Sequence, residues 1–143
     1  CISTIPRPVL KSHHRSNKPR MKKLFAIVPR WLPALLLMAV IFAFSSRTSN
    51  ELPNFGGWDY FVKKSAHGIG YGLLALSYLH ALPNRNYKLA WFLAVLYSLT
   101  DEFHQSFVPG RRASLVDVFV FDAIGAVITL SFHYRFFGVH REK

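Results

Sequence analysis

Acidic residues and cysteine are scarce in this 143-residue sequence. Only seven residues are Asp or Glu, against 18 Lys or Arg, and charged residues make up 17% of the chain. Because soluble domains carry about 25% charged residues, the composition argues against a soluble domain. The one cysteine, Cys1, excludes an intrachain disulfide and leaves the redox compartment open.

The signatures of several enzyme classes are also missing. No G-x-S-x-G elbow surrounds Ser45, Ser46 or Ser106, so a nucleophilic triad is poorly supported. No glycine-rich phosphate loop occurs. Glu102 and His104 form an E-x-H pair, but this is a weak metal-ligand spacing without a second local pair. We therefore predict no metal and no cofactor.

The net charge of +11 suits either nucleic acid or an anionic lipid surface. Eight of the 18 basic residues lie in the first 30 positions, and no other basic run is interleaved with aromatic residues. This distribution predicts a cytoplasmic tail near a membrane and no nucleic-acid partner. Residues 1–20 have the composition of a disordered basic extension. Because Met21-Lys-Lys resembles a natural start, the folded domain is expected to cover residues 21–143.

Hydrophobic residues make up 51% of the chain and gather in four runs. A membrane-spanning helix needs about 20 apolar residues, and the runs near 24–44, 65–82, 88–107 and 115–134 approach that length. The sequence thus predicts an all-α polytopic membrane protein with about four transmembrane helices and the lipid bilayer as its partner. The first run also resembles a signal peptide, but its length and the three runs after it favour an uncleaved helix.

The distribution of basic residues predicts the orientation. With the N-terminus inside, the inner segments hold 13 Lys or Arg and the outer segments hold five. By the positive-inside rule both termini are then cytoplasmic. If residues 1–20 are left out, the inner segments hold eight Lys or Arg and the outer segments still hold five. This topology places the start of the second helix, the end of the third and the start of the fourth at the outer surface.

Polar side chains are concentrated at these three helix ends. Lys64, His67 and Tyr71 follow one helical face. Asp101, His104 and Gln105 are expected to share a face, with Glu102 about a quarter-turn away. Ionisable groups in a membrane segment are costly, so they usually serve a function. The sequence therefore predicts a polar site on the outer face.

Acid–base chemistry is one interpretation of this site. The candidate catalytic residues are Glu102, His104, Asp101 and His67. The candidate substrate-binding residues are Lys64, Tyr71, Gln105, Arg111, Ser114 and Asp117. In this interpretation Lys64 or Arg111 binds an anionic group such as the phosphate of a lipid- or glycan-linked substrate.

Structural roles are the alternative. Lys64 or Arg111 can neutralise Asp101 or Asp117, and Tyr71 can order a neighbour through its hydroxyl. Ser114-x-x-Asp117 fits a capping box, in which the serine side chain accepts from a free backbone N–H.

Two further features concern helix packing. Gly68 and Gly72 form a small-xxx-small pair, and together with Gly125 they predict close packing of the second, third and fourth helices. Asp122 lies further into its helix than Ser114 and Asp117, so it is expected to be protonated or bonded to a neighbouring helix.

A family resemblance rests on the D-E-x-H-Q motif at residues 101–105, the P-G-R at 109–111, and the polar positions around them. This pattern, over roughly residues 30–130, resembles the VanZ-like family of small bacterial membrane proteins. The resemblance implies a four-helix protein of the bacterial inner (plasma) membrane, and the family takes its name from a member associated with teicoplanin resistance. It places Lys64, His67, Tyr71, Asp101, Glu102, His104, Gln105, Arg111, Ser114 and Asp117 on recurrent positions. One departure is Asp122, which follows Asp117 by five residues where the family usually has an Asn or Asp about four residues on.

Three functions are compatible with these features. The first is an envelope component that binds a lipid-linked cell-wall intermediate, or modulates glycopeptide access, through its polar site. The second is an enzyme that acts on a lipid- or glycan-linked substrate. The third is a transporter or proton-relay component, supported mainly by Asp122.

Overall fold

The computed structural model describes residues 18–111 and 113–138, with only the backbone described for residues 18–27 and 49. Throughout these residues the regular structure is helical, as the sequence predicts. The elements are α1 (Lys18–Ser45), η1 (Ser49–Glu51), η2 (Gly56–Trp58), α2 (Asp59–Ala81), η3 (Pro83–Arg85), α3 (Tyr87–Gln105), α4 (Leu115–Asp117), η4 (Val118–Asp122), α5 (Ala123–His133) and η5 (Tyr134–Gly138). The last four form one continuous helix, in which η4 and η5 are π-helical turns.

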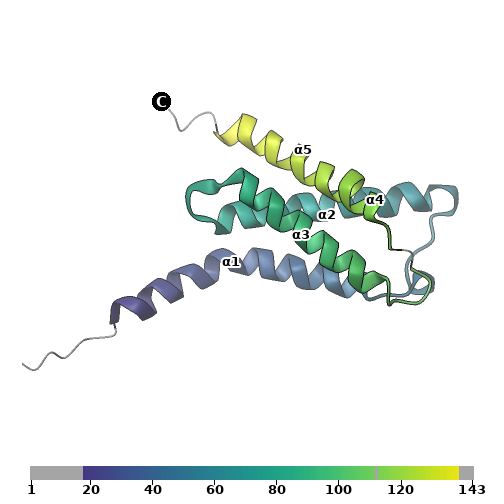
Figure 1. Ribbon diagram of the computed structural model, residues 1–143, viewed down its shortest axis with the longest axis horizontal. Coiled ribbons are helices and arrows are strands. Elements are labelled where there is room, and N and C mark those ends of the chain that lie inside the picture. The colour runs from purple at the N-terminus through teal and green to yellow at the C-terminus, as the bar shows by residue number, and fades with distance from the viewer. Residues whose placement is uncertain (1–17, 112, 139–143) are drawn as a thin grey trace, which may run out of the picture.

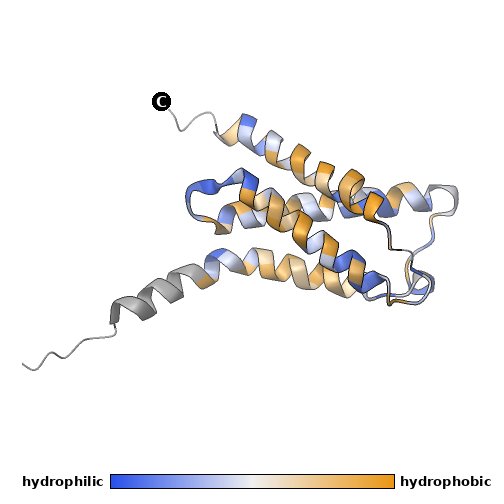
Figure 2. Ribbon diagram, in the orientation of Figure 1, coloured by the Kyte–Doolittle hydropathy of each residue, from blue (hydrophilic) through white to orange (hydrophobic). Residues whose placement is uncertain are grey.

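Four long helical segments lie side by side, with α2 in contact with α1, α3 and α5 (Figure 1). The connection 46–58 and the described residues of the connection after α3, 106–111 and 113–114, share one end of the bundle, at the right of Figure 1. The α2–α3 connection lies at the opposite end, where α1 begins and η5 ends. Hydrophilic residues gather at both ends, and hydrophobic residues follow the middle of the helices (Figure 2).

Local chemistry explains the sharp turn between α2 and α3. Pro83 follows the last residues of α2 and cannot donate the backbone hydrogen bond that would extend the helix. Asn84 and Arg85 then adopt positive φ angles of 62° and 46°. The Asn86 side chain accepts a 3.1 Å hydrogen bond from the Leu89 backbone N–H and so caps the first turn of α3.

The helices differ in extent from the apolar runs. The first helix begins at Lys18, inside the segment 1–20 that was expected to lack structure, and residues 1–17 lie outside the described part of the chain. α2 begins at Asp59, before its apolar run, because polar residues can extend a helix beyond the apolar stretch. Similarly, the fourth helix continues to Gly138.

The exposed surface of the bundle is rich in large apolar side chains. Leu35, Leu36, Ile128 and Phe132 are each more than half exposed, among many others. Soluble monomers rarely expose contiguous apolar patches larger than a few hundred Å². Within the described residues, two helices are long and apolar enough to cross a membrane, at 28–45 and 115–138. These features are typical of a membrane protein.

The contact between α2 and α5 is made backbone to backbone. A Cβ at Gly125 would meet the carbonyl oxygen of Gly68 and would lie 2.8 Å from its Cα. A Cβ at Gly72 would meet the hydroxyl of Thr129 and would lie 3.2 Å from the Gly125 carbonyl oxygen. The predicted packing through these three glycines is therefore confirmed for α2 against α5, because only glycine permits so close an approach.

Candidate functional site

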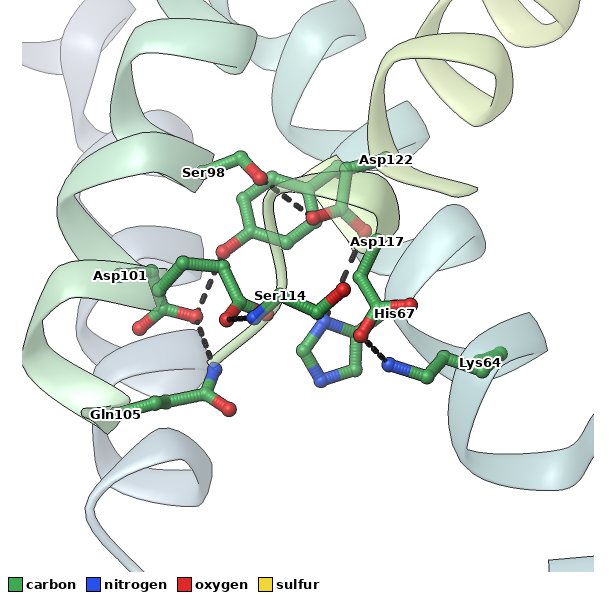
Figure 3. A network of polar contacts seen from close by, with 10 residues as sticks. Lys64, His67, Ser98, Asp101, Gln105, Ser114, Asp117 and Asp122 are labelled. Carbon is green, nitrogen blue, oxygen red and sulfur yellow. Dashed lines mark hydrogen bonds and ion pairs between the residues drawn. The ribbon is translucent and has the colours of Figure 1, made fainter. Parts of the chain in front are cut away.

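Lys64 and Asp117 form an ion pair between α2 and α4 (Figure 3). Both side chains are mostly buried, at 19% and 10% exposure. The Lys64 ammonium also lies 5.7 Å from the ring centre of Tyr60 and 5.8 Å from that of Phe121, within cation–π range. Lys64 therefore neutralises Asp117, as the structural interpretation predicts.

Asp101 is held by two donors in the middle of the network. Its Oδ2 accepts a 2.8 Å hydrogen bond from the Tyr71 hydroxyl and a 2.9 Å hydrogen bond from the Gln105 amide (Figure 3). All three residues are buried. Tyr71 and Gln105, which the sequence offers as substrate-binding groups, thus position a carboxylate, and for Tyr71 this confirms the expected ordering role.

Glu102 caps the fourth helix from a neighbouring one. In a capping box, the acid three residues after the N-cap would accept from the N-cap backbone N–H. Asp117 occupies that position but is paired with Lys64, and Glu102 Oε2 instead accepts the Ser114 N–H at 2.8 Å. The Ser114 side chain forms no capping hydrogen bond. The position of the N-cap is therefore correct, whereas the predicted bonding is wrong.

Asp122 joins the same network one turn deeper. Its Oδ2 accepts a 2.5 Å hydrogen bond from the Ser98 hydroxyl, and its Oδ1 lies 3.7 Å from His67 Nδ1 (Figure 3). The expectation that Asp122 is bonded to a neighbouring helix is confirmed. Ser98 was missed in the sequence, although its place three residues before Asp101 on α3 puts it on the same buried face.

The π-helical turn η4 accounts for the five-residue spacing between Asp117 and Asp122. The Ala123 N–H reaches the Val118 carbonyl, five residues back, so this turn contains one more residue than an α-helical turn. A step of five residues through a π turn therefore rotates around the helix axis by nearly the same angle as a step of four residues in an α-helix. Asp122 is therefore aligned with Asp117 despite the departure from the family spacing.

Deletion of Val120, which is 45% exposed within η4, is expected to convert the π turn to an α turn and to preserve both carboxylate contacts. Deletion of Val127 in α5 is the matched control, because no wide turn there can absorb the loss. We expect thermal unfolding in detergent to leave the first variant close to wild type and to show the second clearly destabilised. Equal destabilisation of both variants would contradict the proposed alignment.

His104 and Arg111 lie apart from this network, against the end of α1. His104 Nε2 is 3.1 Å from the Ser46 hydroxyl, which itself donates to the Phe42 carbonyl at 2.8 Å. The ring centres of His104 and Phe42 are 4.6 Å apart. Arg111 donates to the backbone carbonyls of Phe44 at 2.9 Å and Arg47 at 3.1 Å, and so satisfies carbonyls at the C-terminal end of α1.

The geometry of α3 explains why the expected grouping of residues is wrong for His104. Successive residues turn by about 100° around a helix. Asp101, to which Gln105 donates, faces Tyr71 of α2. Glu102 is turned toward the start of α4, and His104 is turned the other way, toward α1. Glu102 and His104 therefore contact different helices, and their predicted pairing in acid–base chemistry finds no support in the geometry.

A cavity of about 530 Å³ opens between α1 and α2 beside the network, within the usual range of about 300–1,000 Å³ for ligand sites. The apolar part of its wall includes Leu37, Val40, Ile41, Ile69 and Leu73. The polar part consists of Ser45, Lys63, His67, Tyr71, Asp101 and Arg111. The surface of the cavity is therefore mainly apolar, with a few polar side chains in its wall, as in a site for a largely apolar ligand that carries a polar group.

Two residues of this polar wall, Ser45 and Lys63, are absent from the site residues predicted from the sequence. The Lys63 ammonium lies 2.7 Å from the Asp59 carboxylate one turn earlier. The hydrogen bond from Lys63 lowers the pKa of Asp59. Both side chains are 28% exposed, so this pair lies at the rim, unlike the more buried Lys64–Asp117 pair.

The chemistry open to the site is limited by these contacts. Within the described residues, no three His, Cys, Asp or Glu side chains come together as a metal site. The carboxylate of Glu102 is occupied by the Ser114 N–H, whereas His67 both lines the cavity and approaches Asp122. Of the four candidate catalytic residues, His67 therefore has the arrangement closest to that of a general base.

Comparison with known proteins assigns the family. The sequence profile of the VanZ/LLP1 family matches residues 8–137, which is most of the chain. Neither a curated protein nor a solved structure gives a significant match. The profile spans the ion pair, the Asp101 cluster, the π turn and the cavity, so the chain belongs to the VanZ/LLP1 family.

Proposed function

We propose that this protein is a multi-pass component of the bacterial inner membrane that binds a lipid-linked cell-wall intermediate and thereby alters susceptibility to teicoplanin-type glycopeptides. In this proposal all four helical segments cross the membrane, both termini are cytoplasmic, and the polar network with its cavity lies at the outer face. The lipid bilayer and the lipid-linked intermediate are its partners.

One observation carries the proposal. Polar residues from α2, α3 and α4 meet at one end of a bundle that otherwise exposes apolar side chains, and beside them lies a cavity with an apolar and a polar wall. Such a cavity suits a molecule that has a lipid tail and a polar headgroup. Lipid-linked cell-wall intermediates have this character, and glycopeptide antibiotics act on cell-wall synthesis at the outer face.

An enzyme acting on the same class of lipid is the second candidate. It is favoured by the 3.7 Å approach of His67 to Asp122 at the cavity wall, since a histidine supported by a carboxylate can accept a proton. The Ser46–His104 pair is less suited to nucleophilic catalysis, because the Ser46 hydroxyl is already directed at the Phe42 carbonyl. In the part of the chain that the structure describes, no contact specifically favours a transporter, since the Ser98 hydrogen bond gives Asp122 a structural role.

Glycopeptide susceptibility of a bacterial host that expresses residues 1–143 tests the proposal. We expect the wild type to raise the inhibitory concentration of teicoplanin and His67→Ala to abolish the increase. Ser131→Ala, in the separate groove between α3 and α5, should retain the increase at equal membrane abundance. If the wild type leaves susceptibility unchanged, the proposed function is wrong.

The variant Glu102→Gln, in the same susceptibility assay, distinguishes a binding protein from an enzyme that uses the Glu102 carboxylate in catalysis. Glutamine retains an oxygen that can accept the Ser114 N–H, so the cap and the fold should survive. We therefore expect this variant to retain the susceptibility shift. Loss of the shift in a correctly folded Glu102→Gln protein would instead favour an enzyme that uses this carboxylate.

A further inference from the structure

Two residues that line the α1–α2 cavity each carry a buried oxygen without a hydrogen-bond partner among the described residues. These oxygens are Asp101 Oδ1 and Ser45 Oγ, and the two residues are 3% and 4% exposed. Leaving a buried polar atom unsatisfied costs about 1–3 kcal/mol, and more when the group is charged. Both residues line the cavity, although the two oxygens themselves lie beneath its surface.

The chemistry of Asp101 specifies what the ligand must offer. Its Oδ2 already accepts from Tyr71 and Gln105, so the carboxylate is fixed in place. An ionised carboxylate has only acceptor oxygens, and Oδ1 therefore needs a donor. A hydroxyl or amide group supplies one, whereas a fully ionised phosphate does not. The oxygen has almost no accessible surface, so a headgroup donates to it only when the surrounding cavity side chains move aside.

The cations of the same wall suit an anionic group nearer the rim. Arg111 lines the cavity and donates from Nε to the Arg47 carbonyl and from one terminal nitrogen to the Phe44 carbonyl, which leaves further N–H donors of the guanidinium for a ligand. Lys63 also lines the cavity, and its pairing with Asp59 is partly exposed. The apolar wall formed by α1 and α2 continues beside these groups and can accommodate a hydrocarbon chain.

We infer that the cavity selects lipid-linked sugars: a sugar hydroxyl or amide donates to Asp101, the phosphate lies by Arg111 and Lys63, and the lipid chain lies between α1 and α2. This inference rests on the proposed function and adds the headgroup chemistry to it. It distinguishes a glycosylated lipid phosphate from the same lipid phosphate without a sugar, because only the sugar provides neutral donors.

Binding of two matched lipids to the full chain in detergent tests the inference. The probes are a polyprenyl phosphate and the same polyprenyl phosphate carrying one N-acetylhexosamine, with dissociation constants measured by native mass spectrometry. A hydrogen bond to a charged group corresponds to roughly tenfold or more in affinity. We therefore expect the wild type to bind the glycosylated lipid about tenfold more tightly than the bare one.

Asp101→Asn is the decisive variant. The asparagine oxygen can still accept from Tyr71 and Gln105, while its NH₂ group replaces the unpartnered acceptor with a donor. We expect the variant to fold, as checked by thermal unfolding, and to lose the preference for the glycosylated lipid. Ser45→Ala should weaken the preference, and Ser131→Ala should leave it unchanged.

Failure of this inference is distinguishable from failure of the proposed function. Equal binding of the two lipids by the wild type, or an unchanged preference in folded Asp101→Asn, would overturn the headgroup assignment even if glycopeptide susceptibility still shifts. An Asp101-dependent preference without any susceptibility shift would support the headgroup assignment and reject the physiological role.

Discussion

Lys64→Met is expected to destabilise the protein by about 3–5 kcal/mol, the usual cost of removing one partner of a buried ion pair. Methionine retains much of the apolar volume of the lysine stem, so the loss arises mainly from the unpaired Asp117 carboxylate. The measurement is the free energy of unfolding in mixed micelles, with SDS as the denaturant.

Two further variants make this prediction specific. Lys63→Met removes a lysine that is adjacent in sequence but pairs with Asp59 at the partly exposed rim, so little or no loss of stability is expected. The double variant Lys64→Met/Asp117→Asn removes both charges and should recover most of the stability lost in the single variant. The ion pair does not determine the stability if the loss in unfolding free energy of the double variant equals the sum of the losses in Lys64→Met and Asp117→Asn measured separately.

Gly125→Ala is the second substitution with a large expected effect. Its Cβ would enter space occupied by the carbonyl group and Cα of Gly68. These are backbone atoms, so α2 and α5 would have to separate, and such overpacking costs about 1–3 kcal/mol. The variant should show a clearly lower midpoint of thermal unfolding in detergent.

Gly70→Ala is the matched control for this substitution. No atom lies within 4 Å of a Cβ built at Gly70, although this residue lies on the same helix as Gly68 and Gly72. Because alanine is favoured over glycine in a helix interior by about 0.5–1 kcal/mol, this variant should be as stable as wild type or slightly more so. Comparable stability of Gly70→Ala and Gly125→Ala would show that the close helix contact is not essential.

The features best predicted from the sequence are those with a strong periodic or compositional signal. Four helical segments follow from four apolar runs, and the contact of α2 with α5 follows from Gly68, Gly72 and Gly125. A pair between Lys64 and an acidic residue such as Asp117 could also be expected, since charged side chains within a membrane usually pair with opposite charges. In each case one dominant physical requirement, burial or neutralisation, is visible in the sequence itself.

The direction in which each side chain points around its helix is harder to predict from the sequence. A rotation of about 100° separates neighbouring residues of α3, so Glu102 and His104 were expected beside one site but contact α4 and α1 respectively. The capping role of Glu102 depends on a helix that lies 12 residues further along the chain. The π turn η4 has no clear sequence signal, except that Asp122 follows Asp117 by five residues rather than four.

The ion pair between Lys64 and Asp117 has a consequence for biogenesis, because the two residues are separated by 53 positions. In the proposed topology, the ribosome completes α2 and α3 before Asp117 emerges. Until then Lys64 has to keep its ammonium in the headgroup region, where a long side chain can reach water. The last segment thus supplies the counter-charge for the second, so translation arrested before α4 should leave a membrane intermediate that quality-control proteases recognise.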